Sequence, residues 1–167
     1  MNVMQQPRIE KVILSAGATG QDLEKARKLL EIITQKKAQI IRAGPKRRIP
    51  EFGVKPGLEL GTRVTLRGKE ALELLKRLLG AIENSLKKKQ VASNHFSFGI
   101  EEYIEIPGME YIREIGIRGF NATVVFKRAG TRVKHKKVKA SKVPMRHNIR
   151  PEEIIDFMEK TFKTRFE

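Results

Sequence analysis

Residues 61–68, GTRVTLRG, alternate between core-forming and polar side chains from one position to the next. The even positions suit a core: Thr62, Val64 and Leu66. The odd positions are polar and mostly basic: Arg63, Thr65 and Arg67. Because strand side chains point alternately to opposite faces, the segment predicts a strand with one buried face and one basic face. A sheet that contains this strand is covered on one side only, which favours an antiparallel arrangement.

Similar patterns divide the rest of the chain. Further strands are predicted at residues 8–15, 38–42, 94–106 and 119–127. A first helix follows Thr19 and Asp22, which have the spacing of a capping box. Its core positions are Leu23, Ala26, Leu30 and Ile33. A second helix is predicted over residues 69–87, with one apolar seam of Leu72, Leu75, Leu79, Ile82 and Leu86. Pro151 opens a third, which spans residues 151–163 and is expected to dock on the core.

The order β-α-β-β-α-β-β-α predicts an α+β fold, with an antiparallel sheet and helices packed on one of its faces. The other face and the loops are expected to be basic. The 167 residues suffice for a single domain over residues 1–167, and 40% of them are hydrophobic, as in an ordinary folded protein. No internal repeat is apparent.

The net charge of +16 and the pI of about 10.3 predict a surface that attracts RNA, DNA or anionic membranes. A membrane partner is not expected, because no apolar run approaches the ~20 residues that span a bilayer. The amino terminus, MNVMQQPRIEK, also lacks the apolar region of a signal peptide. The chain contains no cysteine, which excludes disulfides, thiolate zinc sites and cysteine catalysis and is typical of a cytoplasmic protein.

The positive charge is concentrated in two stretches. Residues 131–148 carry seven Lys or Arg and no acidic side chain, and residues 36–48 lack acids as well. A single basic run is usually a solvated face or a disordered tail. Two such runs on one small chain instead indicate an extended surface for nucleic acid, because each phosphate contact releases condensed counterions.

Catalysis, cofactors and metals are not expected. Gly68-Lys69 is followed by Glu70, so it does not complete a phosphate-binding loop. The three histidines lie far apart and lack metal-ligand spacing. Glu101 and Glu105 share a predicted strand face, where they are expected to offset nearby cations rather than to form an acid/base pair. Zinc fingers, zippers, compact helix-turn-helix motifs and the RNA-recognition-motif signature are missing too, which favours binding to structured RNA through phosphates, hydroxyls and shape.

Five motifs carry a specific resemblance. They are PRIEKV at 7–12, IPEFGVKPG at 49–57, GTRVTLRG at 61–68, FSFGIEE at 96–102 and VPMRH at 143–147. In this order and at these distances they resemble the large-subunit ribosomal protein five family, in its archaeal and eukaryotic form. The likeness covers residues 7–162. One departure is Ser15, which stands where the family usually has Asn at the end of the first strand; a serine still donates and accepts hydrogen bonds.

The resemblance implies a structural protein of the central protuberance that binds 5S rRNA and touches large-subunit rRNA. It also implies contacts with the P-site tRNA and with neighbouring ribosomal proteins, including a bridge to a small-subunit head protein. Together with the basic stretches it predicts these rRNA-binding residues: Ser15, Lys36, Lys37, Arg42, Arg63, Thr65, Arg67, Arg132, Lys134, Lys136, Lys137, Lys139, Lys142, Arg146 and His147. The predicted tRNA-binding residues are Lys46, Arg47, Arg48, Ile49, Phe52 and Lys55.

Two other classes of function stay open at this point. The same basic surface suits a free-standing RNA-binding chaperone or regulator, which co-sedimentation with the large subunit through a moderate salt wash would distinguish. A nucleic-acid enzyme would need a clustered acid or metal site, and the sequence contains no such pattern.

Overall fold

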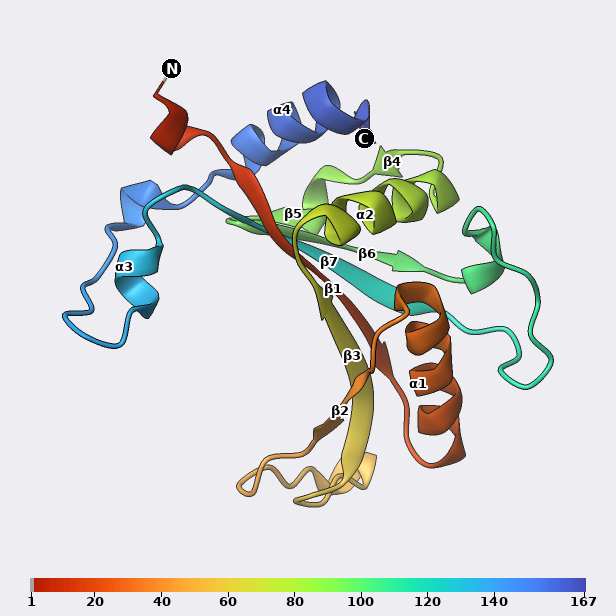
Figure 1. Ribbon diagram of the computed structural model, residues 1–167. Helices are drawn as coiled ribbons and strands as arrows, with labels where there is room; N and C mark the ends of the chain where they lie inside the picture. The colour runs from red at the N-terminus through yellow and green to blue at the C-terminus, as the bar shows by residue number, and fades with distance from the viewer. Residues whose placement is uncertain (1) are drawn as a thin grey trace. The chain divides into compact units, whose positions relative to one another are not determined.

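The computed structural model describes residues 2–167 and has an α+β fold with a mostly antiparallel sheet (Figure 1). One sheet has six strands in the order β2-β3-β1-β7-β6-β5, and a second sheet pairs β4 with β8 in parallel. The strands are β1 Arg8–Gly17, β2 Gln39–Arg42, β3 Glu59–Leu66, β4 Ser85–Leu86, β5 Val91–Ala92, β6 His95–Ile100, β7 Phe120–Lys127 and β8 Arg165–Phe166. The α-helices are α1 Gln21–Thr34, α2 Lys69–Ala81, α3 Arg132–His135 and α4 Pro151–Phe162.

The chain forms two compact units. The first unit contains the chain up to Val12, Arg67–Phe98 and Thr123–Glu167. The second contains Ile13–Leu66 and Gly99–Ala122. Strands β1, β6 and β7 contribute residues to both units. The expected single domain over residues 1–167 stays a prediction.

In the second unit, β3 has the two faces that its alternation predicts. Thr62, Val64 and Leu66 are buried, whereas Arg63 and Thr65 are exposed. Strand β2 pairs with it in antiparallel register, with Ile41 opposite Gly61. Gly61 has a structural reason to be glycine, because a Cβ atom there would lie 2.7 Å from the carbonyl oxygen of Ala16. Helix α1 buries the predicted core positions and one more: Leu23, Ala26, Leu29, Leu30 and Ile33.

The predicted capping box at the start of α1 is wrong. The N-cap residue is Gly20, with φ +61°, and no side chain caps the helix. Because the helix begins at Gln21, Asp22 occupies the second helical position rather than the third, and Thr19 lies outside the cap. Asp22 instead forms an ion pair with Arg118. The chain therefore enters α1 through a glycine with positive φ, and not through a residue whose side chain caps the helix.

In the first unit, α2 is shorter than predicted, and its buried face includes the predicted Leu75 and Leu79 but not Leu72. It ends at Ala81, and Leu72 is 40% exposed. Glu83 and Asn84 then adopt left-handed backbone angles, which stops the helix and lets Leu86 reach the core from strand β4. The buried residues of the helix are Ala71, Leu74, Leu75, Leu78 and Leu79.

The strand predicted over residues 94–106 is also shorter, because β6 ends at Ile100. A single 3-10 turn, Tyr103–Glu105, follows in the second unit. Tyr103 is fully buried there, and its hydroxyl accepts a hydrogen bond from the backbone N–H of Ile112 at 2.8 Å. This bond fixes the turn and directs Ile104 towards solvent, although the alternating pattern placed it in the core.

Helix α4 belongs to the first unit and begins at Pro151, as predicted. Ile154 and Met158, on the apolar face that their spacing marks, are fully buried. Phe157 packs its ring edge-on against Phe126 of β7, with the centroids 5.7 Å apart. These contacts fix α4 and leave its polar side to solvent.

Candidate nucleic-acid interface

On β3 the exposed side chains lie in a row with their polar groups outward. The Arg63 guanidinium donates to the side-chain oxygen of Gln39 on β2 at 3.2 Å. Thr65, two residues further along β3, is also exposed, and its hydroxyl makes no hydrogen bond within the described residues. Ser15 is half-buried on β1, one residue before the buried Ala16. This face of the second unit therefore combines a cation with hydroxyl groups that both donate and accept hydrogen bonds.

In the first unit, Glu10 of β1 lies between two cations. Its carboxylate is 3.4 Å from the Arg67 guanidinium and 3.6 Å from the Lys127 ammonium. The Arg67 side chain is 59% exposed and that of Glu10 only 25%. One carboxylate cannot neutralise two cations, and exposed ion pairs of this kind stabilise a protein by only ~0–1 kcal/mol. Arg67 and Lys127 are thus held in place but remain available to a phosphate.

The second basic stretch is spread over several elements of the second unit. Lys36 and Lys37 are exposed between α1 and β2. Arg42, at the end of β2, forms an ion pair with Glu59 of β3 at 2.9 Å and remains 68% exposed. The structure therefore does not gather this stretch into one cluster, because β2 carries Arg42 away from the two lysines.

The carboxylate of Glu31 holds the backbone at the start of this stretch. Glu31 of α1 accepts a hydrogen bond from the backbone N–H of Ala38 at 3.1 Å and one from the Arg27 side chain at 3.0 Å. The bond from Ala38, followed by that from Arg27, lowers the pKa of Glu31 below its ordinary value. The carboxylate thereby fixes the chain that enters β2.

We use the name β2–β3 loop for residues 43–58, which lie at the free end of the β2–β3 hairpin (Figure 1). Ile49 and Val54 form an isolated antiparallel bridge with two backbone hydrogen bonds of 3.0 Å. At the base, Ala43 donates to the Leu58 carbonyl at 2.7 Å. Phe52 is 79% exposed at the tip. All the predicted tRNA-binding side chains are exposed: Lys46, Arg47, Arg48, Ile49, Phe52 and Lys55.

We use the name basic segment for residues 131–148, which run from the end of β7 to α4 through the short helix α3 (Figure 1). Its seven cations are all exposed, and none forms an ion pair within the described part of the chain. A backbone bond from Ser141 to the Val133 carbonyl closes one turn at 3.2 Å. The cations are Arg132, Lys134, Lys136, Lys137, Lys139, Lys142 and Arg146.

His147 differs from the other residues predicted in the basic segment. It is half-buried, and its Nε2 lies 3.0 Å from the Ala129 carbonyl oxygen. With Nε2 protonated, the ring donates to that carbonyl and ties the end of the segment back to the residues after β7. The structure therefore gives His147 a positioning contact within the chain, which the sequence pattern did not indicate.

Two further groups of exposed cations lie outside the residues predicted to bind RNA. The alternation along residues 119–127 predicts the exposure of Lys127, because its side chain points to the face of the sheet opposite to that of its buried neighbour Phe126. Lys87, Lys88 and Lys89 are exposed in succession after β4 and were visible as a run in the sequence. No sequence pattern indicated that Glu10 pairs with Arg67 and Lys127, because these contacts depend on how the strands pack.

A metal site and a membrane span each place requirements on the described residues. Across residues 2–167 there is no group of three or more His, Cys, Asp or Glu side chains placed to hold a metal ion. None of the helices in that range is long and apolar enough to cross a membrane.

Comparison with known proteins identifies the family. A family model described as "Ribosomal protein L5" matches residues 2–55, and the model for the C-terminus of the ribosomal L5 family matches residues 59–146. The relatives include archaeal proteins named "Large ribosomal subunit protein uL5". The Nanoarchaeum equitans protein is 41% identical over 94% of both chains. The proteins of Methanococcoides burtonii and Methanosphaera stadtmanae are 37% and 35% identical over 99% and 100% of both chains. The chain therefore belongs to the ribosomal protein L5 family, whose members are structural proteins of the ribosome and not enzymes.

Proposed function

We propose that the protein is a structural constituent of the large ribosomal subunit that binds 5S rRNA in the central protuberance. In this role it also contacts large-subunit rRNA and the P-site tRNA, and it meets neighbouring ribosomal proteins, including one at the head of the small subunit. It acts in the cytoplasm, within the ribosome. Family membership and the names of the relatives support the ribosomal part of this proposal.

The observation that carries the RNA-binding part is the set of unpaired cations in the basic segment. Seven cations within eighteen residues repel one another, and the described part of the chain supplies no carboxylate to offset them. Phosphates supply the missing negative charge, and the counterions that they release contribute further free energy. A duplex or a folded RNA, with its regular phosphate spacing, suits such a segment.

The exposed face of β3 supports contacts of a second kind. Arg63 and Thr65 present a guanidinium and a hydroxyl on a rigid strand. Such groups bind phosphates and ribose 2′-hydroxyls, through which proteins recognise structured RNA by its shape. Positions fixed by a strand hold these donors more accurately than a mobile tail does.

The β2–β3 loop supports a separate contact with tRNA. Its backbone is held by the Ile49–Val54 bridge, so its shape exists before binding. Arg47 and Arg48 suit phosphates, and the exposed ring of Phe52 suits stacking or apolar contact with a nucleoside. A loop that only joined two strands would not require these side chains.

The test is to identify the RNA that the purified chain selects. The chain is incubated with total RNA at moderate salt, and the bound RNA is sequenced. We expect 5S rRNA to be enriched over other RNAs of similar length. Equal recovery of all RNAs would contradict specific 5S rRNA binding. If the protein also left the large subunit in a moderate salt wash, a free-standing chaperone would be the better description.

A further inference from the structure

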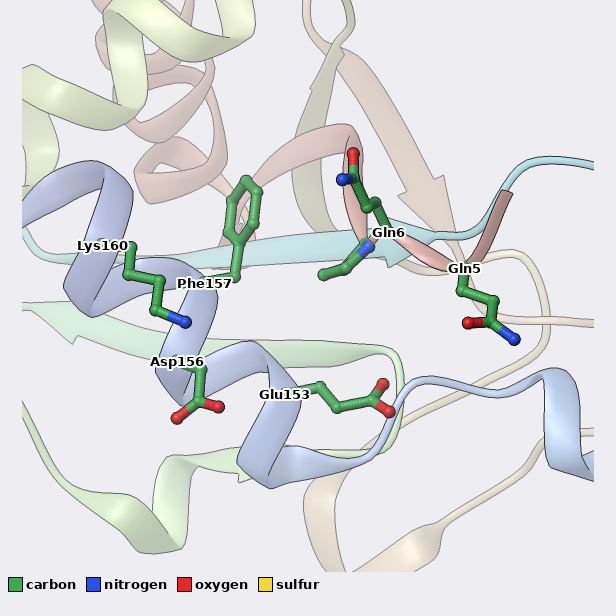
Figure 2. Close-up of a pocket in the computed structure, with 7 residues that line it drawn as sticks. Gln5, Gln6, Glu153, Asp156, Phe157 and Lys160 are labelled. Carbon is green, nitrogen blue, oxygen red and sulfur yellow. The ribbon is translucent and has the colours of Figure 1, made fainter. Parts of the chain in front are cut away.

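A small pocket lies between α4 and the segment that leads into β1, within the first unit (Figure 2). Its volume is about 230 Å³, which is room for a bulky side chain. Pro7 and the ring of Phe157 give it an apolar lining, while Gln5 and Gln6 lie on the side opposite the helix. Both glutamine side chains are exposed, and neither amide has a hydrogen-bond partner among the described residues. The pocket thus offers an apolar floor and free amides that can bond to a peptide backbone.

The helix beside the pocket has the opposite charge to the rest of the protein. Within Pro151–Phe162 there are four carboxylates and one cation, Lys160, in a chain of net charge +16. Glu153 lines the pocket and is already paired with Arg128. The remaining carboxylates have no ion pair among the described residues: Glu152, Asp156 and Glu159.

These three carboxylates follow a helical spacing of four and then three residues. Residues at that spacing share one side of a helix, so the carboxylates form a stripe along α4. Asp156 belongs both to this stripe and to the pocket lining. An apolar pocket therefore opens directly beside a row of negative charges that nothing in the described chain neutralises.

We propose that this pocket and the acidic stripe of α4 bind a Lys/Arg-rich segment of a neighbouring protein, anchored by one apolar side chain in the pocket. The apolar anchor fills the space over Phe157, and the flanking cations meet Asp156 and the other stripe carboxylates. Interfaces commonly combine a buried anchor with a charged rim that sets orientation. Lys160, at one end of the pocket, disfavours a cation there and so restricts how the segment is placed.

Charge decides between this partner and RNA. Phosphates would be repelled by the stripe, and RNA has the basic segment and the β2–β3 loop on which to bind. A basic protein segment is attracted to the carboxylates of α4. The cationic surfaces of the chain repel it, so α4 is the surface on which it can bind. The surface thus divides the partners of this protein by their charge.

The test is photo-crosslinking in assembled large subunits. A photoreactive amino acid replaces Gln6, which lies at the pocket, and the crosslinked peptides are identified by mass spectrometry. The same amino acid at Glu73, an exposed carboxylate on α2, is the control position. We expect Gln6 to crosslink to a Lys/Arg-rich segment of another protein and Glu73 not to reach the same segment. Crosslinks from Gln6 to rRNA or to a second copy of this chain, or the absence of crosslinks, would overturn the proposal.

A charge reversal tests the role of the stripe. Asp156→Lys should lower the crosslink yield at Gln6 by about fivefold, the scale of one or two exposed ion pairs. Glu73→Lys changes the net charge equally and should leave the yield unaltered. The neutral variant Asp156→Asn should give an intermediate yield, which separates lost attraction from new repulsion. An equal loss in both reversals would show a general effect of net charge and would also overturn the proposal. The 5S rRNA affinity of each variant, measured separately, distinguishes this failure from a failure of RNA binding.

Discussion

The β2–β3 loop and the basic segment are both cationic, but their backbones are held differently. In the loop, the Ile49–Val54 bridge and the Ala43–Leu58 bond join residues that approach from opposite directions. In the basic segment, helix α3 has only four residues, a single backbone bond from Ser141 to Val133 closes one turn, and His147 ties the end of the segment to Ala129. The loop extends an existing hairpin, whereas the segment must hold its own shape against the repulsion of seven cations.

One protein can therefore use positive charge in two ways. A preformed loop loses little conformational entropy on binding, so its few cations can position a mobile ligand such as tRNA. A segment with many cations and few bonds between its parts gains more from phosphates and loses more entropy as it becomes fixed. It suits a permanent RNA partner. Substitutions in the two regions should consequently affect different RNAs, and by different amounts.

The largest effect is expected from neutralising the basic segment. Replacing Lys134, Lys136, Lys137 and Lys139 with Gln should weaken 5S rRNA binding by about 1 kcal/mol for each cation, or about 10³-fold together. The slope of log affinity against log salt, which is negative, should become less steep by about three to four. Filter binding over a series of salt concentrations measures both quantities. An unchanged slope would show that the segment does not contact phosphates.

Limited digestion with trypsin compares the two regions directly. Both expose Lys and Arg, but the loop backbone is bridged, so the free protein should be cut first between Arg132 and Arg146. Bound 5S rRNA should protect these sites. Mass spectrometry of early fragments identifies the order of cleavage. Initial cutting after Arg47 or Arg48, or equal cutting of the basic segment with and without RNA, would reverse the comparison.

A smaller loss is expected at the end of β3. Arg67→Ala should weaken 5S rRNA binding by about 1–3 kcal/mol, the scale of a charge-assisted hydrogen bond, without unfolding the protein. Glu10 would then retain Lys127 as its partner, so the fold should tolerate the change. Arg77→Ala, on the exposed side of α2, is a matched control that should have little effect. An unchanged dissociation constant for Arg67→Ala at fixed salt would remove this residue from the interface.

The β2–β3 loop should affect tRNA and spare 5S rRNA. A Gly/Ser replacement of residues 47–50 removes Arg47 and Arg48 and disrupts the bridge at Ile49. Retention of P-site tRNA on assembled ribosomes should fall about tenfold, or about 1.4 kcal/mol, while the 5S rRNA affinity of the free protein stays within a factor of about two. The opposite result, lost 5S rRNA binding with normal tRNA retention per particle, would place the loop in the rRNA interface.

The features that could be predicted from the sequence are those set by neighbouring residues. The alternation along β3 identified its buried and exposed faces, because each side chain's direction follows from the one before it. The seam predicted for α2 was right at Leu75 and Leu79 and wrong at Leu72, because the leucines of the helix permit two overlapping seams and only packing against the rest of the unit selects one. The pairing of Arg67 with Glu10 joins residues 57 positions apart, and no local pattern reveals it.

The smallest expected effect concerns Glu31, which fixes the chain entering β2 and hence the base of the hairpin that carries the β2–β3 loop. Glu31→Gln should lower the free energy of unfolding by about 1 kcal/mol at neutral pH, because the bond from Ala38 and the pair with Arg27 are weakened. The pKa of Glu31 is lowered in the folded state, so its contribution is present above the unfolded value of 4.5.

That contribution should be lost as the pH falls through the lower folded pKa, because protonation then removes the same charge that the substitution removes. Urea denaturation of both proteins from neutral pH to below pH 4.5 measures the difference. Glu24→Gln, an exposed carboxylate on the same helix, is the control and should leave stability nearly unchanged. A Glu31→Gln difference that persisted unchanged to the lowest pH would mean that the carboxylate's charge does not hold the entry to β2. The preformed shape of the loop would then depend on the backbone bonds of the hairpin alone.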